Sequence, residues 1–320
     1  MKKSPYININ RIEFVVTYQC SGKCKHCSFG DKLNHSDGFK HIKIHEVVES
    51  IKQVAEIFPV SSVMTFGGEP LLYPDVVCAI HETASSVGIR TKQLITNGYF
   101  TKDGELCRKV ATALKNAGIN NLLLSVDAFH QETIPFQAVY QFAKHTKESG
   151  IPKMRLHPAW VVNQKHNNPY NEETKKIISR FNDLHIQISD GNNIFLAGNA
   201  VKYFAEYYDK PHIDLSEICG TVPYTTSLNN ITSLSIVPNG DVMVCGFVIG
   251  NIYKQSMQDI LCYYNPYEDE WMNAILHGGV RELLELSKRK GIIVDASSCY
   301  SACDLCHKIN NLRLNGNFCE

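Results

Sequence analysis

Strand-like and helix-like segments alternate through the first 190 residues of this chain, and this alternation limits the fold most strongly. About six segments are rich in β-branched and aromatic residues, and the first of them is Arg11–Thr17. The segments between them carry apolar residues at helical spacing, as in Ile44–Phe58. Repeated β-α alternation implies parallel strands joined by right-handed crossovers. We therefore expect an α/β fold whose functional side chains follow the carboxyl ends of the strands.

The predicted elements of this region are short and closely spaced. The predicted strands are Arg11–Thr17, Ser62–Phe66, Thr91–Thr96, Asn121–Val126, Lys153–Trp160 and His185–Ser189. The predicted helices are Ile44–Phe58, Asp75–Val87, Lys102–Ala117, Phe136–Ser149 and Glu172–Leu184.

The pattern changes after Gly191. Pro238-Asn239-Gly240 lies between two strand-like runs, and Asn-Gly in that position predicts a hairpin. Helical patterns follow at Met257–Tyr264 and Val280–Lys290, and a cysteine-rich tail comes after them. We therefore divide the chain into a core domain of residues 1–190 and a smaller α+β domain of residues 191–320.

Composition and charge narrow the range of partners. Lys+Arg and Asp+Glu each number 32, so no global field attracts nucleic acid. The segment Met1–Asn10 has no apolar run typical of a signal peptide. The longest apolar stretches, such as Leu122–Val126, are too short to cross a bilayer. We expect a cytoplasmic chain that binds neither nucleic acid nor membrane.

Twelve cysteines are many for a cytosolic chain, where disulfides rarely persist. Clustered cysteines in such a chain indicate metal binding or catalysis. One cluster lies near the start, at Cys20, Cys24 and Cys27. A second group lies near the end, and three more cysteines precede it. These are Cys299, Cys303, Cys306 and Cys319, with Cys219, Cys245 and Cys262 before them.

The first cluster forms a C-x3-C-x2-C loop directly after the first predicted strand. Three thiolates this close can surround one iron–sulfur cluster, and Gly22 lets the backbone bend around the sulfurs. Three ligands leave one iron of a four-iron cluster open to a small molecule, as in catalytic zinc sites. The alternatives are buried free thiols or a structural zinc site with His26 as the fourth ligand.

The cysteine loop resembles the cluster-binding motif of the radical S-adenosylmethionine (SAM) superfamily. Gly67-Gly68-Glu69-Pro70, after the second strand, matches the G-G-E-P motif of that family. Thr96-Asn97-Gly98 and Ser125-Val126-Asp127 continue the resemblance after the third and fourth strands. One departure is His26, where the family usually has an aromatic residue, and imidazole is also a planar ring.

The resemblance implies a partial (β/α)6 TIM-like barrel. Cys20, Cys24 and Cys27 would hold a [4Fe–4S] cluster whose open iron binds the methionine amino and carboxylate groups of SAM. Reductive cleavage would release a 5′-deoxyadenosyl radical that abstracts hydrogen from a substrate, with electrons from a flavodoxin- or ferredoxin-type donor. The SAM contacts that the resemblance implies are Gly67, Gly68, Glu69, Pro70, Asn97, Ser125 and Asp127.

The second group repeats the C-x3-C-x2-C spacing at Cys299–Cys306, but no G-G-E-P follows it. Together with Cys245 on the predicted hairpin and Cys219, it resembles the SPASM/twitch extensions that hold auxiliary [4Fe–4S] clusters. The resemblance implies a second cluster on Cys219, Cys245, Cys303 and Cys306, with Cys299 as a substitute ligand. The alternative is a four-cysteine zinc site.

The other cysteines have simpler interpretations. Cys78 and Cys107 lie in helical patterns and are expected to be core thiols, while Cys262 is unassigned. A thiol that is not a ligand could donate a hydrogen atom to a substrate radical, as in some peptide-epimerising radical SAM enzymes. The candidate donors are Cys219, Cys299 and Cys319.

Our leading hypothesis is a radical SAM enzyme that acts on a peptide, by maturation or epimerisation, because such extensions are frequent in peptide maturases. The first alternative is a small-molecule enzyme, either a dehydrogenase or an enzyme of cofactor biosynthesis. The alternative from another class is a non-catalytic metal-binding or redox-sensing protein.

Overall fold

A single nine-stranded sheet organises the fold. The computed structural model describes residues 3–30, 33, 38–210, 213–220 and 225–314. The strands are β1 (Ile7–Val15), β2 (Ser62–Phe66), β3 (Thr91–Thr96), β4 (Asn121–Ser125), β5 (Lys153–His157), β7 (Gln187–Ile188), β9 (Ile231–Ile236), β10 (Asp241–Val244) and β11 (Phe247–Asn251). Their order in the sheet is β11-β10-β9-β1-β2-β3-β4-β5-β7. All neighbours from β9 to β7 are parallel, and β10 is antiparallel to both of its neighbours.

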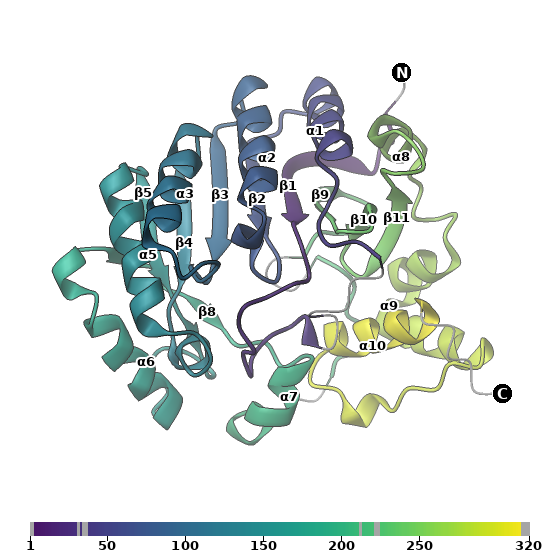
Figure 1. Ribbon diagram of the computed structural model, residues 1–320. Helices are drawn as coiled ribbons and strands as arrows, with labels where there is room; N and C mark the ends of the chain where they lie inside the picture. The colour runs from purple at the N-terminus through teal and green to yellow at the C-terminus, as the bar shows by residue number, and fades with distance from the viewer. Residues whose placement is uncertain (1–2, 31–32, 34–37, 211–212, 221–224, 315–320) are drawn as a thin grey trace.

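Helices cover one face of this sheet, among them α1, α2, α3 and α5. The α-helices of the described residues are α1 (Ile44–Ile57), α2 (Pro74–Ser86), α3 (Gly104–Asn116), α4 (Ala128–Gln131), α5 (Phe136–Ser149), α6 (Pro169–Ser179), α7 (Asn199–Phe204), α8 (Met257–Tyr263), α9 (Glu270–Arg289) and α10 (Ala302–Leu314). Figure 1 shows α1, α2, α3 and α5 side by side along the sheet. Alternate strand residues such as Ile12 and Phe14 are fully buried in the core, whereas Arg11 and Glu13 between them are only partly buried. The opposite face therefore carries polar side chains.

The α/β prediction is confirmed, and the differences in element bounds have local causes. The predicted strand Lys153–Trp160 is interrupted at Pro158, which has no N–H for the ladder, and it continues as β6 (Ala159–Trp160). β6 pairs with β8 (Asn192–Asn193) in a separate two-stranded sheet. The predicted helix Val280–Lys290 begins earlier, at Glu270, and is kinked at Gly279, where φ is 66°.

The hairpin of the second region joins the sheet of the first. β9 pairs in parallel with β1, so that Arg11 lies opposite Ser233 and Phe14 opposite Ile236. In Figure 1, α9 and α10 gather beside this part of the sheet, away from α3 and α5. The strands after residue 190 therefore extend the core sheet, and a domain boundary at residue 190 stays a prediction.

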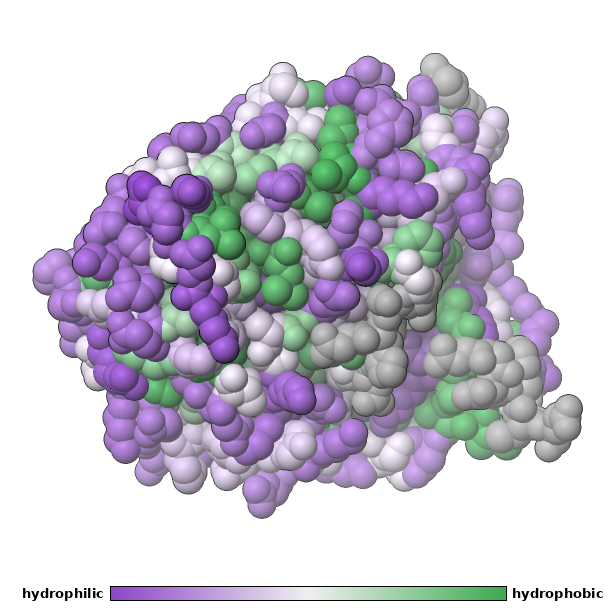
Figure 2. Space-filling view, in the orientation of Figure 1, coloured by the Kyte–Doolittle hydropathy of each residue, from purple (hydrophilic) through white to green (hydrophobic). Residues whose placement is uncertain are grey.

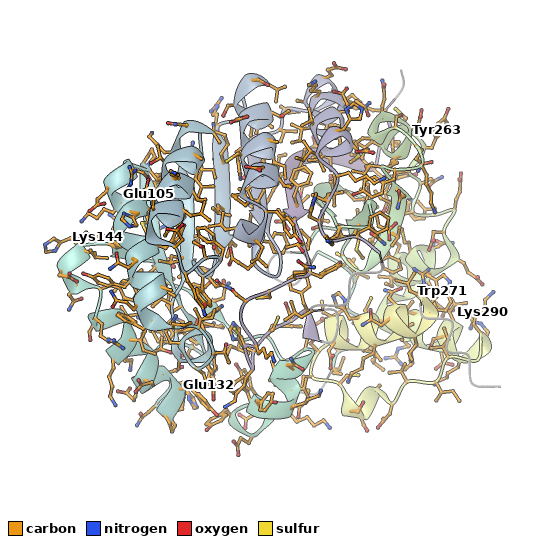
Figure 3. All side chains as sticks on the ribbon, in the orientation of Figure 1. Glu105, Glu132, Lys144, Tyr263, Trp271 and Lys290 are labelled. Atoms are coloured by element: carbon orange, nitrogen blue, oxygen red, sulfur yellow. The ribbon has the colours of Figure 1, made fainter. Side chains whose placement is uncertain are left out.

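Among the described residues, ten large apolar side chains are exposed to solvent. Figure 2 shows a face on which hydrophilic residues predominate, with apolar residues gathered in its upper middle. Tyr263 on α8 is the most exposed of the large apolar side chains in the described part of the chain, at 81%, and it projects outward in Figure 3. None of the described helices combines the length and apolar character needed to span a bilayer.

A buried polar pair gives the core a pH dependence that can be measured. His81 on α2 and Thr65 on β2 are fully buried, and His81 Nε2 lies 2.9 Å from Thr65 Oγ1. Burial lowers the pKa of His81 to about 3 from its usual 6.5. Between these values the unfolded chain binds a proton that the folded chain does not. The free energy of unfolding should therefore fall as the pH decreases below about 6.5.

We expect His81→Gln to flatten this dependence, because glutamine can still bond Thr65 but does not titrate. The measurement is the urea midpoint under anaerobic conditions at about pH 7.5 and about pH 5.5. His45→Gln is the control, because His45 is exposed on α1. Equal slopes in wild type and His81→Gln would contradict the assignment.

Candidate active site

The three cysteines of the first loop lie beyond the carboxyl end of β1, as predicted. Cys24 is buried, and Cys20 and Cys27 are half-buried. The loop turns back on itself, with Gly22 N–H donating to Cys20 Sγ at 3.3 Å and Cys27 N–H to the Cys24 carbonyl at 3.2 Å. Burial raises the pKa of Cys20 to about 12 and also raises that of Cys27. A thiol must lose its proton to bind a metal, and burial makes the resulting thiolate unfavourable. The positive charge of a bound metal would offset this cost of burying a thiolate.

The spacing of the three thiols can be compared with the spacing around a single zinc ion. Zn–S bonds of 2.3 Å in a tetrahedral site place sulfurs about 3.8 Å apart. Within the described residues, the one group of three ligand atoms that all lie within 4.8 Å is Cys24, His26 and His130. The sulfurs of Cys20, Cys24 and Cys27 are therefore spaced more widely than a single zinc ion requires. This spacing leaves room for a group larger than one metal ion, whereas His26 groups with Cys24 and His130.

The glycine pair after β2 holds the cysteine loop against the sheet. Gly68 N–H donates to the Thr17 carbonyl at 2.8 Å, and Glu69 N–H donates to the Gln19 carbonyl at 2.7 Å. A Cβ on Gly67 would lie 2.5 Å from the Thr17 oxygen, and one on Gly68 would lie 2.1 Å from the Gln19 oxygen. The resemblance implies that Gly67 and Gly68 contact SAM. In the structure, the loop backbone occupies that space.

Gly68→Ala should therefore displace the cysteine loop. We expect the iron retained after anaerobic reconstitution to fall to less than about half, with a loss of stability of about 1–3 kcal/mol from overpacking. Iron analysis and the urea midpoint measure the two effects. Gly104→Ala on α3 is the matched control, because a Cβ there meets nothing within 4 Å. Full iron content in Gly68→Ala would show that the close contact is not needed.

Glu69 braces the ends of two strands. Its carboxylate is fully buried and accepts hydrogen bonds from Leu71 N–H at 2.8 Å, Thr96 Oγ1 at 2.7 Å and Asn97 N–H at 2.8 Å. Burial raises its pKa to about 7. Pro70, also buried, begins the short turn that follows. Glu69 therefore joins β2 to β3, and its oxygens do not face open solvent.

Asn97 connects the end of β3 to the cysteine loop. Its Nδ2 donates to Ser21 Oγ at 3.2 Å and lies 3.7 Å from Cys20 Sγ. Its Oδ1 accepts from Tyr99 N–H at 2.8 Å. The amide therefore touches a predicted cluster ligand directly.

Two residues of β5 next to Ser125 were missed by the sequence analysis. Ser125 pairs in register with His157, and Arg155 is one pleat earlier on the same face. The Arg155 guanidinium donates to Asn121 Oδ1 at 2.8 Å, but its buried Nε has no hydrogen-bond partner among the described residues. His157 Nδ1 lies 2.7 Å from Ser189 Oγ. The available signal was alternation along Lys153–Trp160, which puts both side chains on the face of Ser125.

Asp127 is engaged by protein donors. Its fully buried carboxylate accepts from the N–H groups of Phe129 at 3.0 Å, His130 at 2.9 Å and Ala159 at 3.1 Å. The His130 ring adds a fourth donor, with Nδ1 2.8 Å from each carboxylate oxygen. A carboxylate can accept about four hydrogen bonds, so these four donors occupy its acceptor positions. Asp127 therefore has little left for a ribose hydroxyl.

The second group of cysteines surrounds a cavity of about 240 Å³. The cysteines that line it are Cys219, Cys245, Cys303 and Cys306. They come from the segment before β9, from the turn between β10 and β11, and from the first turn of α10. Cys245 has a φ of 52°, which is uncommon for a residue with a side chain. Glu13 and Ser235, on the polar face of the sheet, line the same cavity.

Cys299, the predicted substitute ligand, lies outside this cavity. Cys299 Sγ is 3.4 Å from Lys308 Nζ and 3.6 Å from the Asp295 carbonyl, and Cys299 does not line the cavity. Cys319 falls outside the described residues. Cys78 and Cys107 pack with the apolar core, as expected, and Cys262 on α8 is half-buried.

Aromatic contacts hold α10 against α9 at this cavity. The Arg313 guanidinium lies 5.3 Å from the ring centre of Trp271, which Figure 3 labels on α9. Asn310, one turn after Cys306, donates from Nδ2 to Cys306 Sγ at 3.5 Å. These contacts keep the two cysteines of α10 facing the hairpin.

Comparisons with known proteins give a family and a fold. A family model described as "Radical SAM superfamily" matches residues 14–187, and so ends before the second group of cysteines. A curated relative from Saccharolobus islandicus, "Probable GTP 3′,8-cyclase", is 27% identical over 214 residues, covering 65% of this chain and 62% of the relative. The "GTP 3′,8-cyclase" of Limosilactobacillus fermentum is 31% identical over 121 residues, covering 38% of this chain and 34% of the relative.

The match to the first of these relatives thus spans less than two thirds of its length. A solved structure described as "Native anSMEcpe with bound AdoMet" aligns with a TM-score of 0.50 at 14% identity, covering 97% of this chain and 98% of the other. That likeness concerns the fold alone.

Proposed function

Because the chain belongs to the radical SAM superfamily, we propose that it cleaves SAM reductively at a [4Fe–4S] cluster and abstracts hydrogen from a substrate. Cys20, Cys24 and Cys27 would hold that cluster. The observation that carries the proposal is their grouping beyond the carboxyl end of β1, at a spacing wider than one zinc ion needs. The cluster and SAM together supply a carbon-centred radical. The chain supplies ligands, orientation and a site shielded from water.

The polar face of β4 and β5 supplies the proposed SAM contacts. Arg155 carries a positive charge and a buried Nε without a partner among the described residues, which suits the methionine carboxylate. Ser125 and His157 lie beside it on the same face. The remaining proposed contacts border the cysteine loop or act through their backbone. They are Asn97, Gly67, Gly68 and Pro70. Glu69 and Asp127 act indirectly, by bracing the strand ends.

Arg155→Gln should weaken SAM binding without removing the cluster. A charge-assisted hydrogen bond contributes about 1.5–3 kcal/mol, so we expect KM for SAM to rise about 10- to 100-fold. Iron content should stay at the wild-type level. Arg108→Gln is the control, because Arg108 pairs with Glu105 on the exposed side of α3, where Figure 3 labels Glu105. An unchanged KM for SAM in Arg155→Gln would show that Arg155 does not contact SAM.

We further propose a second [4Fe–4S] cluster in the cavity lined by Cys219, Cys245, Cys303 and Cys306, which makes residues 191–320 a twitch-like extension. No three of these sulfurs lie within 4.8 Å of one another, again wider than a zinc site requires. Four thiolates would complete the coordination of a cluster and leave no open iron. This cluster would then exchange electrons instead of binding SAM.

Two substrate classes remain candidates. The relatives named GTP 3′,8-cyclase favour a small molecule, whereas the peptide hypothesis rests on the sequence analysis alone. The reduced enzyme, incubated with SAM and GTP, should form 5′-deoxyadenosine above its background rate if the substrate resembles that of these relatives. An unchanged rate would exclude GTP as the substrate and leave the peptide hypothesis and other small molecules to be tested. A flavodoxin- or ferredoxin-type protein is the proposed electron donor, and replacing dithionite with reduced flavodoxin tests it.

The proposed function is tested on protein purified and reconstituted without oxygen. We expect iron and sulfide in equal amounts and a broad absorption at about 400 nm from the thiolate-bound cluster. Reduction in the presence of SAM should yield 5′-deoxyadenosine and methionine. Zinc without iron, or a loaded cluster that never cleaves SAM, would overturn the proposal.

A further inference from the structure

A group of metal-binding side chains lies beside the cysteine loop and only partly overlaps it. Cys24, His26 and His130 each offer one ligand atom, and these three atoms all lie within 4.8 Å of one another. Within the described part of the chain, no other set of three such residues is grouped so closely, and Cys20 and Cys27 do not belong to this one. The group therefore combines one cysteine of the loop with two histidines that the proposed cluster leaves unused.

The two imidazole rings are spaced as two ligands of one zinc ion are. Zn–N bonds of about 2.0–2.1 Å at a tetrahedral angle put the ring centres roughly 5 Å apart. The ring centres of His26 and His130 are 5.0 Å apart. His26 Nδ1 is buried and has no hydrogen-bond partner among the described residues. Such a nitrogen is uncommon in a folded protein, and a metal ion is one of the partners that can satisfy it.

Asp127 orients His130 as a metal ligand. The Asp127 carboxylate is fully buried and lies 2.8 Å from His130 Nδ1. A carboxylate accepts hydrogen bonds, so Nδ1 donates and Nε2 is the ring nitrogen left for a metal ion. Histidines that bind metal ions almost always donate their other N–H to an acceptor of this kind, which fixes the ring and strengthens the ligand. Asp127 is therefore a positioning residue for the group.

The surroundings of the group suit a divalent ion. Cys24 packs in an apolar cluster with Phe129 and Phe204, where water screens charge poorly. Buried charges in proteins are paired or bind metal ions. The thiolate of Cys24 and the carboxylate of Asp127 together carry two negative charges, which balance the charge of one divalent ion.

We propose that Cys24, His26 and His130 bind one zinc ion in a chain that has not yet received its cluster, and that this ion and the cluster exclude each other. One thiolate and two imidazoles favour zinc over magnesium or calcium, and three protein ligands leave the fourth zinc position to water. Because the zinc ion and the cluster both require Cys24, zinc bound here blocks cluster assembly. The exclusion rests on the proposed function, whereas the zinc site itself does not.

The first test measures how much zinc the full-length chain binds after a chelator has removed its metal, under reducing and anaerobic conditions. We expect His130→Phe to bind about one zinc ion fewer than wild type, with affinity at this site at least ~100-fold weaker. Cys20→Ala is the matched control and should bind as much zinc as wild type. The second group of cysteines is intact in all three proteins, so its own zinc does not affect the comparison. Equal zinc in His130→Phe and wild type, or a loss of zinc in Cys20→Ala, would overturn the inference.

A second measurement leaves His130 unchanged and remains decisive if His130→Phe does not fold. Wild-type protein labelled with ¹⁵N-histidine and freed of metal is titrated with zinc, and the ring nitrogens are followed by nuclear magnetic resonance. The signal of His26 is identified by its absence in His26→Phe. We expect zinc to shift the ring nitrogens of His26 and His130. A His26 ring that does not respond to saturating zinc would contradict the proposed site.

The exclusion is tested by reconstitution with iron and sulfide, with and without prior addition of zinc. The SAM-binding cluster is measured by the electron-paramagnetic-resonance signal that changes when SAM is added. In wild type we expect zinc to reduce this signal at least ~10-fold. His26→Phe keeps all three cysteines but lacks a zinc ligand, so its signal should not depend on zinc. Equal inhibition of the two proteins would refute the exclusion. A wild type that takes up no iron even without zinc would instead overturn the proposed function.

Discussion

Replacing Cys20 with alanine should abolish SAM cleavage. The structure groups three thiols beyond the end of β1, and removing one leaves two ligands for a cluster that already has an open iron. We expect 5′-deoxyadenosine formation to fall at least ~100-fold and about four iron atoms per chain to be lost. The measurement is product quantification by mass spectrometry, beside iron and sulfide analysis of the same anaerobic sample.

Cys78→Ala is the matched control for this experiment, because Cys78 is half-buried on α2 and packs against the core. It should keep both iron and activity near the wild-type level. If Cys20→Ala formed as much 5′-deoxyadenosine as wild type, the loop would not hold the reactive cluster, and the proposed radical chemistry would have no source.

The second prediction with a large effect concerns the cysteine-lined cavity beside the β10–β11 hairpin. Cys245→Ala should remove about four iron atoms per chain and leave about four. SAM cleavage should persist, because the first cysteine loop belongs to a different part of the sheet. Turnover of the true substrate should fall sharply, since the lost cluster would no longer exchange electrons. Iron analysis combined with separate assays of SAM cleavage and substrate turnover distinguishes these outcomes.

Cys299→Ala provides the matched control for the cavity. Its sulfur contacts Lys308 and the Asp295 carbonyl and does not line the cavity. We expect it to retain all its iron. Loss of iron in Cys299→Ala but not in Cys245→Ala would mean that the ligand set has been assigned incorrectly, and zinc in place of iron would favour the structural alternative.

The local elements of the core were largely predictable from residue patterns. The predicted strands at 62–66 and 91–96 agree with β2 and β3, and the predicted helix at 136–149 agrees with α5. Their apolar periodicities are strong because each element buries one face against its neighbours. The break at Pro158 could have been anticipated from the missing N–H. The kink at Gly279 could not, because it depends on the close approach of the Ser216 carbonyl.

The candidate site was predicted in part. The cysteines and the G-G-E-P segment were found because they are close in sequence. Arg155 and His157 were missed because only the alternation along Lys153–Trp160 marks them, and their importance comes from lying on the same face as Ser125, which pairs with His157 on the neighbouring strand. Asp127 was assigned to SAM because of its place after β4, but its contacts depend on how α4 and β6 fold around it.

The α/β core and the position of the cysteine loop after the first strand were predicted from the sequence alone. Both depend on local patterns, namely the hydrophobic periodicity of each element and the spacing of residues within one motif. Tertiary structure decided which later cysteines share a cavity, that β9 extends the sheet beside β1, and that Asp127 faces His130 and not open space. Those relations join residues far apart in the chain, and their geometry arises only when the sheet and helices pack together.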